Sequence, residues 1–210
     1  MSRRLSMKRQ HYKIQQNSED WGRLRLGKFT ASSFKDLFMG KSTAGYEKAI
    51  YTPVHERLTG SSPERFYGEY MKRGHELEPY TIEEYEIETF DKVEDGGFWA
   101  LGDWIGASPD GLVRDDGLLE GKAPAYNTFM KYLLKGELPK EYYWQVHGQM
   151  YVTDRNWVDF VAYHPDYKLT ILRINRDEKI ENELIEKLNE SIEKAQELLT
   201  KLEAKLCHAA

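Results

Sequence analysis

The stretches SPDGL at residues 108–112 and LEGK at residues 119–122 enclose the segment that decides the fold. Pro-Asp-Gly in the first stretch and Asp115-Asp116-Gly117 between the two are strong turn signals, and short apolar runs flank the second turn. This pattern predicts strands that are joined as a hairpin. Asp110 and Glu120 are therefore expected on neighbouring strands, facing each other.

This hairpin carries the kinds of side chain that a metal-dependent hydrolase uses. Two acidic residues on adjacent strands can bring their carboxylate oxygens together around a hard cation such as Mg²⁺. Because strand side chains alternate, Lys122 points to the same face of the sheet as Glu120. A cation there can orient a metal-bound water and offset charge that develops on a phosphate during phosphodiester hydrolysis. The spacing alone is better explained by a solvated hairpin, in which Asp110 is only a turn residue.

Helical patterns precede the hairpin. A helix is expected to start at Thr30 and to bury its phenylalanine and leucine side chains. Residues 44–58 form a second predicted helix, which Pro53 must kink or divide. Residues 63–89 form a third, with a break or bend at Pro79.

Strands and helices alternate from the hairpin to the end of the chain. The predicted elements are strands within 92–122, helices at 125–135 and 139–153, strands at 157–163 and 169–174, and a helix at 177–205. The last helix is amphipathic, and its apolar face is assigned to the core. This order predicts an α/β sandwich, in which helices flank one mixed central sheet.

The composition fits one globular domain. The chain has 210 residues with 40% hydrophobic content, and no stretch approaches the ~20 consecutive apolar residues of a membrane span. We expect a single domain at 20–205, preceded by a basic arm at 1–19 that is flexible or grips DNA. The single cysteine, Cys207, cannot form an internal disulfide, and the N-terminus lacks the apolar core of a secretory signal. A cytoplasmic location is therefore expected.

Several motifs in one order carry a resemblance to a known family. Asp110 followed ten residues later by Glu-x-Lys resembles the PD-(D/E)XK nuclease superfamily, and within it the YqaJ-type viral recombinases, the family of the phage lambda exonuclease. Further segments that resemble this family are Trp21–Gly27 running into Thr30–Ser32, Arg73–Pro79, Gln145–Val152, Trp157–Tyr163 and Ile174–Lys179. The resemblance covers residues 20 to about 200, and it implies a restriction-endonuclease-like core.

The resemblance also implies roles for individual residues. Asp110 and Glu120 would hold the catalytic metal, with the carbonyl of Gly121 as a backbone ligand. Glu78 would hold a second metal together with Asp110. Lys122 would position or activate the attacking water. The resemblance implies two Mg²⁺ ions in each site, for which Mn²⁺ would substitute.

Further roles concern the substrate. Gln145 would contact the water or the scissile phosphate, whereas Gln149, one helical turn later, is assigned to packing or the surface. Arg25, Ser32 and Ser108 would bind a terminal 5′-phosphate, for which a guanidinium and hydroxyls are suitable donors. One departure is Gly121, because a β-branched or large apolar residue is more usual at this strand position. Close approach of its backbone to a metal would account for the glycine.

The activity that the resemblance implies is a Mg²⁺-dependent 5′→3′ exonuclease acting on ends of double-stranded DNA. It would release mononucleotides and leave 3′ overhangs for recombination by strand annealing in a phage or prophage. A homotrimeric ring around DNA and a single-strand-annealing partner protein are implied as well. The net charge of −5 is compatible with DNA if positive groups line the channel of such a ring.

Two alternatives stay open. One is a structure-specific or restriction-like endonuclease of the same superfamily, because recognition of an end rests on Arg25 and the two serines alone. The other is a nuclease-like module that binds DNA without cutting it. The presence of Asp110, Glu120 and Lys122 together argues against the second alternative.

Overall fold

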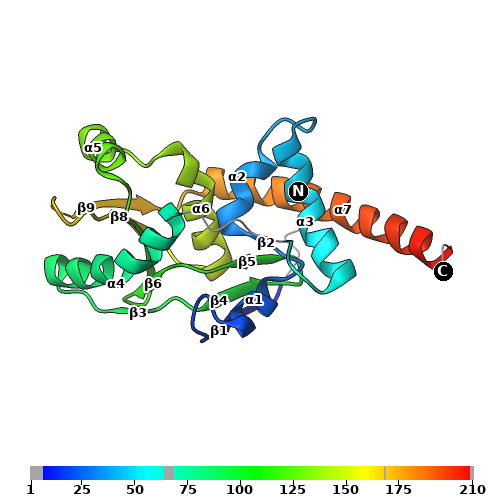
Figure 1. The fold of residues 1–210 in the computed structure, drawn as a ribbon, viewed down its shortest axis with the longest axis horizontal. Helices are drawn as coiled ribbons and strands as arrows, with labels where there is room; N and C mark the ends of the chain where they lie inside the picture. Colours follow the sequence, from blue (N-terminus) through cyan, green and yellow to red (C-terminus); the bar gives the residue numbers. More distant parts are fainter. Residues whose placement is uncertain (1–6, 64–68, 168, 209–210) are drawn as a thin grey trace.

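The computed structural model describes residues 7–63, 69–167 and 169–208, and within these the side chains at 69–75 and 208 are not described. The first six residues of the predicted arm and residues 64–68 of the third predicted helix lie outside the described residues. The strands form two sheets, where the sequence predicted one (Figure 1).

The first sheet has four strands in the order β1-β4-β5-β2. Its strands are β1 (Arg9–Tyr12), β4 (Phe98–Leu101), β5 (Ile105–Ala107) and β2 (Phe29–Thr30). β2 runs parallel to β5, and the other pairs are antiparallel.

The second sheet has five strands in the order β3-β6-β7-β8-β9. Its strands are β3 (Val93–Asp95), β6 (Gly111–Val113), β7 (Gly117–Lys122), β8 (Trp157–Ala162) and β9 (Thr170–Asn175). β7 and β8 are parallel, and the remaining pairs are antiparallel. The predicted hairpin is confirmed as β6 and β7, in which Gly111 pairs with Leu119.

The chain crosses between the two sheets twice at nearly the same place. Gly96 and Gly97 join β3 to β4, and Ser108–Asp110 join β5 to β6. A Cβ at Gly96 would lie only 1.8 Å from the carbonyl oxygen of Pro109, so the two connections pass in backbone contact that only glycine permits. Because the strands change sheet here, one continuous sheet does not form, and Asp110 lies at the boundary.

Helices cover both faces of the second sheet. The helices are α1 (Glu19–Arg25), η1 (Ala31–Ser33), α2 (Phe34–Leu37), α3 (Ala44–Thr59), α4 (Glu69–Thr89), α5 (Tyr126–Lys135), η2 (Lys140–Tyr142), α6 (Tyr143–Thr153) and α7 (Glu178–His208). α4 packs against β7 and β8, whereas α6 packs against β8 and against strands of the first sheet. The second sheet with α4 and α5 occupies one end of the molecule, and α3 with the last turns of α7 the other (Figure 1).

Neither of the two prolines divides its helix. α3 continues through Pro53, and α4 continues through Pro79. A proline inside a helix costs about 3 kcal/mol, because it lacks an N–H and its ring crowds the preceding turn. Burial of Pro53 and Val54 on α3, and of Tyr85 further along α4, supplies packing that local sequence patterns do not register.

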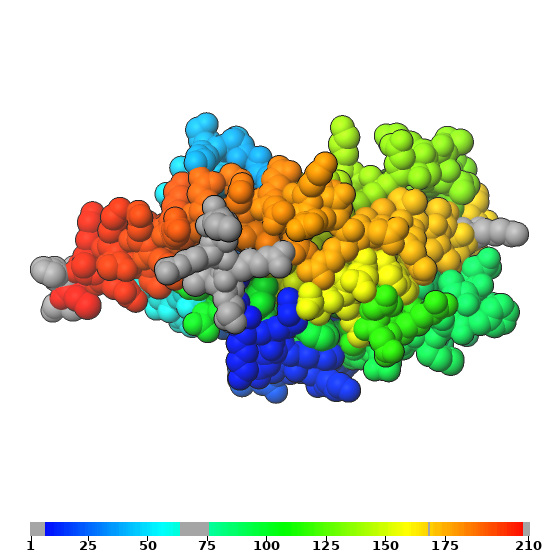
Figure 2. Space-filling view, turned by 180° about the vertical axis from the view of Figure 1, so that it is seen from behind, coloured from blue at the N-terminus to red at the C-terminus, as the bar shows by residue number. Residues whose placement is uncertain are grey.

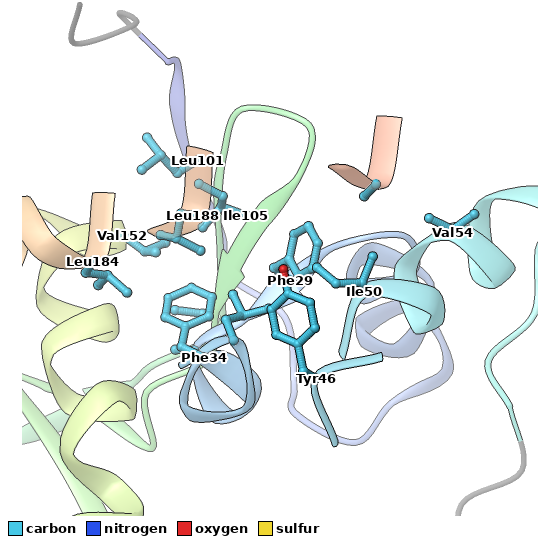
Figure 3. Close-up of a cluster of buried hydrophobic side chains, with 14 residues drawn as sticks. Phe29, Phe34, Tyr46, Ile50, Val54, Leu101, Ile105, Val152, Leu184 and Leu188 are labelled. Carbon is cyan, nitrogen blue, oxygen red and sulfur yellow. The ribbon is translucent and has the colours of Figure 1, made fainter. Parts of the chain in front are cut away.

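The largest core lies between the first sheet and the helices α2, α3, α6 and α7. Figure 3 shows Phe29, Phe34, Tyr46 and Ile50 meeting Leu184 and Leu188 of α7 in this core. Leu184, Leu188 and Ala195 are buried, which confirms the predicted inner face of the last helix. α7 crosses the face of the molecule seen in Figure 2, and its last turns extend beyond the rest of the chain.

Part of the predicted flexible arm belongs to the first sheet. Residues 9–12 pair with β4 along their whole length. The guanidinium of Arg9 donates to the carbonyl oxygens of Val152 at 2.7 Å and Tyr151 at 3.2 Å. Strand pairing and these bonds therefore join residues 9–12 of the predicted arm to the first sheet. None of the described helices is long and apolar enough to cross a membrane.

Candidate active site

β7 presents alternate side chains to the two helices that cover it. Leu118 packs with Val146 of α6, whereas Leu119 packs with Tyr85 of α4. By the same alternation Glu120 and Lys122 face α6, and Gly121 faces α4. The site is therefore built on both faces of a single strand.

Glu120 is held by three donors. Its side chain is 1% exposed. Oε1 accepts from the ammonium of Lys122 and, at 2.5 Å, from Nε2 of Gln145, and Oε2 accepts from Nε2 of Gln149 at 2.5 Å. Hydrogen bonds of a donor to a carboxylate are charge-assisted, and they are stronger than bonds between neutral groups.

Gln149, which the sequence assigned to packing or the surface, is buried against Glu120. Its side chain is 1% exposed and holds one oxygen of Glu120, while its own Oε1 has no hydrogen-bond partner. Gln145 is half-buried and reaches the other oxygen from one helical turn earlier. The one-turn spacing of the two glutamines on a helix that faces the sheet was the available signal.

Asp110 stands opposite Glu120, just before β6. One of its oxygens, Oδ2, accepts the backbone N–H of Gly121 at 2.8 Å. Burial raises the pKa of Asp110 well above its ordinary value of 3.8, and the neighbouring carboxylates of Glu120 and Glu78 raise it further. Lys122 and the Gly121 N–H oppose this rise without cancelling it. The positive charge around Asp110 is therefore too small to balance the negative charge of its carboxylate and of the two neighbouring carboxylates.

Lys122 remains a cation. Burial lowers the pKa of its ammonium, but the carboxylates of Glu120 and Asp110 outweigh burial and leave the pKa above its usual value. The side chain is 25% exposed, and its Nζ lies 5.2 Å from the ring centre of Tyr142. Lys122 can therefore orient a water or a phosphate oxygen as a donor, as the sequence predicted.

Glu78 approaches from the opposite side, on α4. Thr81, three residues later on the same helix face, lies against Gly121. The influence of Glu78 on the pKa of Asp110 agrees with this placement. The side chains of Arg73 to His75, the first part of the motif that singled out Glu78, lie outside the described ones.

The donor set suits a hard cation that also binds substrate. Among the described residues, no three His, Cys, Asp or Glu side chains are grouped closely enough to hold a metal by themselves. Mg²⁺ is commonly held by one or two carboxylates, with water and substrate phosphates completing its shell. This pattern fits the carboxylates of Asp110 and Glu120 and the carbonyl of Gly121. The excess of negative charge around Asp110 favours a cation there.

A second polar cluster adjoins this site. The guanidinium of Arg25 donates to Ser108 Oγ at 3.3 Å and to Thr30 Oγ1 at 3.4 Å, and Thr30 Oγ1 lies 3.4 Å from Ser32 Oγ. Trp21 donates from its indole N–H to Ser108 Oγ at 2.9 Å and stacks under Arg25, with 4.2 Å between guanidinium carbon and ring centre. The structure thus brings together Arg25, Ser32 and Ser108, and adds Trp21 and Thr30, to which the sequence assigned no part in binding the phosphate.

Comparison with known proteins bears on this geometry. The family model described as the YqaJ-like viral recombinase domain matches residues 20–156. The chain belongs to this family. It is 32% identical to an alkaline exonuclease from Laribacter hongkongensis over 92% of this chain and 100% of that chain, with a TM-score of 0.84. The structure of that exonuclease in complex with dAMP matches equally, with a TM-score of 0.85.

A more distant structure shares the fold. The phage related exonuclease from Haemophilus somnus 129PT is 20% identical over 85% of this chain and 96% of that chain, with a TM-score of 0.60. No curated protein matches the chain. The YqaJ family and the shared architecture confirm the predicted PD-(D/E)XK nuclease core and identify the chain as a deoxyribonuclease of the exonuclease type. The roles of individual residues stay predictions.

Proposed function

We propose that the protein is a Mg²⁺-dependent 5′→3′ exonuclease that degrades one strand from the ends of double-stranded DNA. The observation that carries this proposal is that the carboxylate site and the Arg25 cluster adjoin through one connection. Ser108 and Asp110 are two residues apart, so their Cα atoms lie within about 7 Å of each other. A site for a terminal phosphate at that distance from the cleavage site selects the last nucleotide of a strand.

The residues of the chain would share the work as follows. Arg25 and the hydroxyls of Ser108 and Ser32 bind the terminal 5′-phosphate and fix the strand's polarity. Asp110 and Glu120 hold Mg²⁺, which when bound supplies Lewis acidity toward the phosphate and the attacking water.

The side chains around Glu120 would complete the site. Lys122 donates to the attacking water or to a phosphate oxygen as negative charge develops. Gln145 shares Glu120 with Lys122 and is the glutamine exposed enough to contact the substrate. Glu78 would contribute a second metal site together with Asp110.

The products and context follow from this activity. Hydrolysis of the first phosphodiester bond from the 5′ end would release a mononucleotide, and repeated hydrolysis would leave a 3′ overhang. A single-strand-annealing protein would take up this overhang in phage-type recombination. The Laribacter exonuclease bound to dAMP supports a mononucleotide product. We further propose a homotrimeric ring around DNA, working in the cytoplasm of a bacterial host. A channel lined by positive groups would reconcile the net charge of −5 with a polyanionic substrate.

The decisive test is degradation of linear duplex DNA with either 5′-phosphate or 5′-hydroxyl ends, with Mg²⁺ or EDTA. Closed circular DNA and the variant Lys122→Ala serve as controls. Mg²⁺-dependent loss of phosphorylated duplexes, with circles intact and the variant inactive, is the expected result. Cutting of circles would replace the proposal by the endonuclease alternative. Binding of DNA without cutting under any metal would replace it by the non-cutting module.

A further inference from the structure

Gly121 marks a place where a helix touches a strand backbone. A Cβ added to Gly121 would lie 3.1 Å from Cγ2 of Thr81 on α4, and 3.7 Å from both Asp110 Oδ2 and Leu119 Cδ2. A separation of 3.1 Å is tighter than ordinary van der Waals contact, so even an alanine requires α4 to give way by a few tenths of an ångström. Thr81 is 1% exposed, and its methyl group occupies the space that a side chain at 121 would need.

Thr81 has little freedom to turn away. Its hydroxyl donates to the carbonyl oxygen of Leu77 in the preceding turn, at 3.1 Å, which fixes the direction of the methyl group. One turn further along α4, the hydroxyl of Tyr85 donates to Oδ2 of Asp159 on β8, at 2.7 Å. Arg173 holds both oxygens of the buried Asp159, each at 2.8 Å. α4 is therefore anchored just beyond the point where Thr81 meets Gly121.

Glu78, Thr81 and Tyr85 lie on one face of α4, at positions i, i+3 and i+7. Tyr85 and Thr81 dock this face on the sheet, and Glu78 extends it by one turn to the edge where Asp110 stands. A change in the separation of α4 from β7 at Thr81 therefore moves the carboxylate of Glu78 relative to that of Asp110.

We propose that Gly121 is a positioning residue: by leaving room for the Thr81 methyl, it lets α4 approach β7 closely enough for Glu78 to share a metal ion with Asp110. This inference rests on the proposed metal-dependent function. It gives a physical reason for the glycine in Glu-Gly-Lys that differs from close approach of the strand backbone to a metal. An experiment can separate the two explanations. Only packing against Thr81 makes the loss of metal affinity from a larger residue at 121 depend on the residue at 81.

The experiment measures Mn²⁺ binding to the DNA-free protein by calorimetry, with thermal unfolding in EDTA to establish that each variant is folded. The variants are Gly121→Ala, the double variant Gly121→Ala/Thr81→Ser, and Glu78→Gln as the reference for a lost ligand. Serine retains the hydroxyl bond to Leu77 and lacks the methyl group. Gly22→Ala is the matched control, because a Cβ at Gly22 on α1 meets nothing within 4 Å.

One Mn²⁺ site should be lost in Glu78→Gln. We expect Gly121→Ala to lower the Mn²⁺ affinity of that same site by about 10- to 100-fold, the usual range for residues that orient metal ligands. The double variant should recover most of that affinity, and Gly22→Ala should bind as the wild type does. Unchanged Mn²⁺ binding by Gly121→Ala, or a loss that Thr81→Ser does not repair, would overturn the inference. If the wild type itself binds no Mn²⁺ and cuts no DNA, the proposed function fails instead.

Discussion

Replacing Asp110 by asparagine should make the metal-free protein more stable. The amide is isosteric with the carboxylate and can still accept the N–H of Gly121, a bond worth about 1 kcal/mol. What the substitution removes is the charge, which is buried beside the carboxylates of Glu120 and Glu78 and only partly offset by Lys122. We expect a gain of about 1–2 kcal/mol in the free energy of unfolding at pH 7, typical when a strained functional group is neutralised.

The pH dependence of this gain has a definite sign. The folded-state pKa of Asp110 lies above its ordinary value of 3.8, chiefly through burial, so the folded chain binds the proton more tightly than the unfolded chain. The contribution of Asp110 to stability is therefore most favourable below the ordinary value and is lost as the pH rises through the raised pKa. The advantage of Asp110→Asn should grow across that window and stay constant above it.

Metal should reverse the order of the two proteins. A ligand at 100 times its Kd stabilises the folded state by about 2.7 kcal/mol, which the wild type gains and Asp110→Asn largely forgoes. Unfolding is to be followed by heat and by urea, in EDTA and in saturating Mn²⁺. In EDTA the variant should melt about 2–8 °C higher, and with Mn²⁺ it should melt lower than the wild type. A variant that is equally or less stable than the wild type in EDTA at pH 7 would refute the reasoning.

Three further substitutions test individual contacts. Lys122→Met should lower single-turnover cleavage by about 10²–10⁴-fold while DNA affinity, measured by fluorescence anisotropy, changes little, because the lysine donates at the reacting centre; unchanged cleavage would contradict its role. Gln149→Leu should lower the free energy of unfolding in urea by about 1–3 kcal/mol, because it leaves an oxygen of Glu120 without its donor. Gln145 is half-buried, and Gln145→Leu should chiefly slow cleavage. The reverse pattern would exchange the roles of the two glutamines. Tyr85→Phe should cost about 2 kcal/mol, because it removes one bond to the buried carboxylate of Asp159; an unchanged urea midpoint would show that this bond does not anchor α4.

Most elements of the fold after residue 44 could be predicted because they follow from local periodicity, whereas β1, α1 and β2 were not predicted. The turn signals around Asp110 gave the β6–β7 hairpin, and the apolar face of residues 177–205 gave α7. Pro53 and Pro79 do not divide their helices, because their local cost is outweighed by burial that only the folded chain reveals. The division into two sheets depends on the contact of Gly96 with Pro109, which are distant in sequence, and no periodicity reports such a contact.

The same distinction applies to the site. Glu120 and Lys122 share a face of one strand, so alternation alone placed them together. The turn signals of the hairpin placed Asp110 opposite Glu120, whereas Gln145 was found through a family motif, since nothing local states what a helix will meet. The burial of Gln149 and the fit of Thr81 against Gly121 depend on how α6 and α4 dock on β7, and lay beyond both approaches.

The two carboxylates at the centre of the site are supported unequally, and the inequality matters for metal binding. Each oxygen of Glu120 accepts from at least one side-chain donor. Among the described residues, the hydrogen-bond donor to Asp110 is one backbone N–H, and two carboxylates stand beside it. A cation therefore gains most at Asp110, the residue that both proposed metal ions would share. Binding of the first ion would offset the repulsion between the carboxylates of Glu78 and Asp110 that raises the pKa of Asp110.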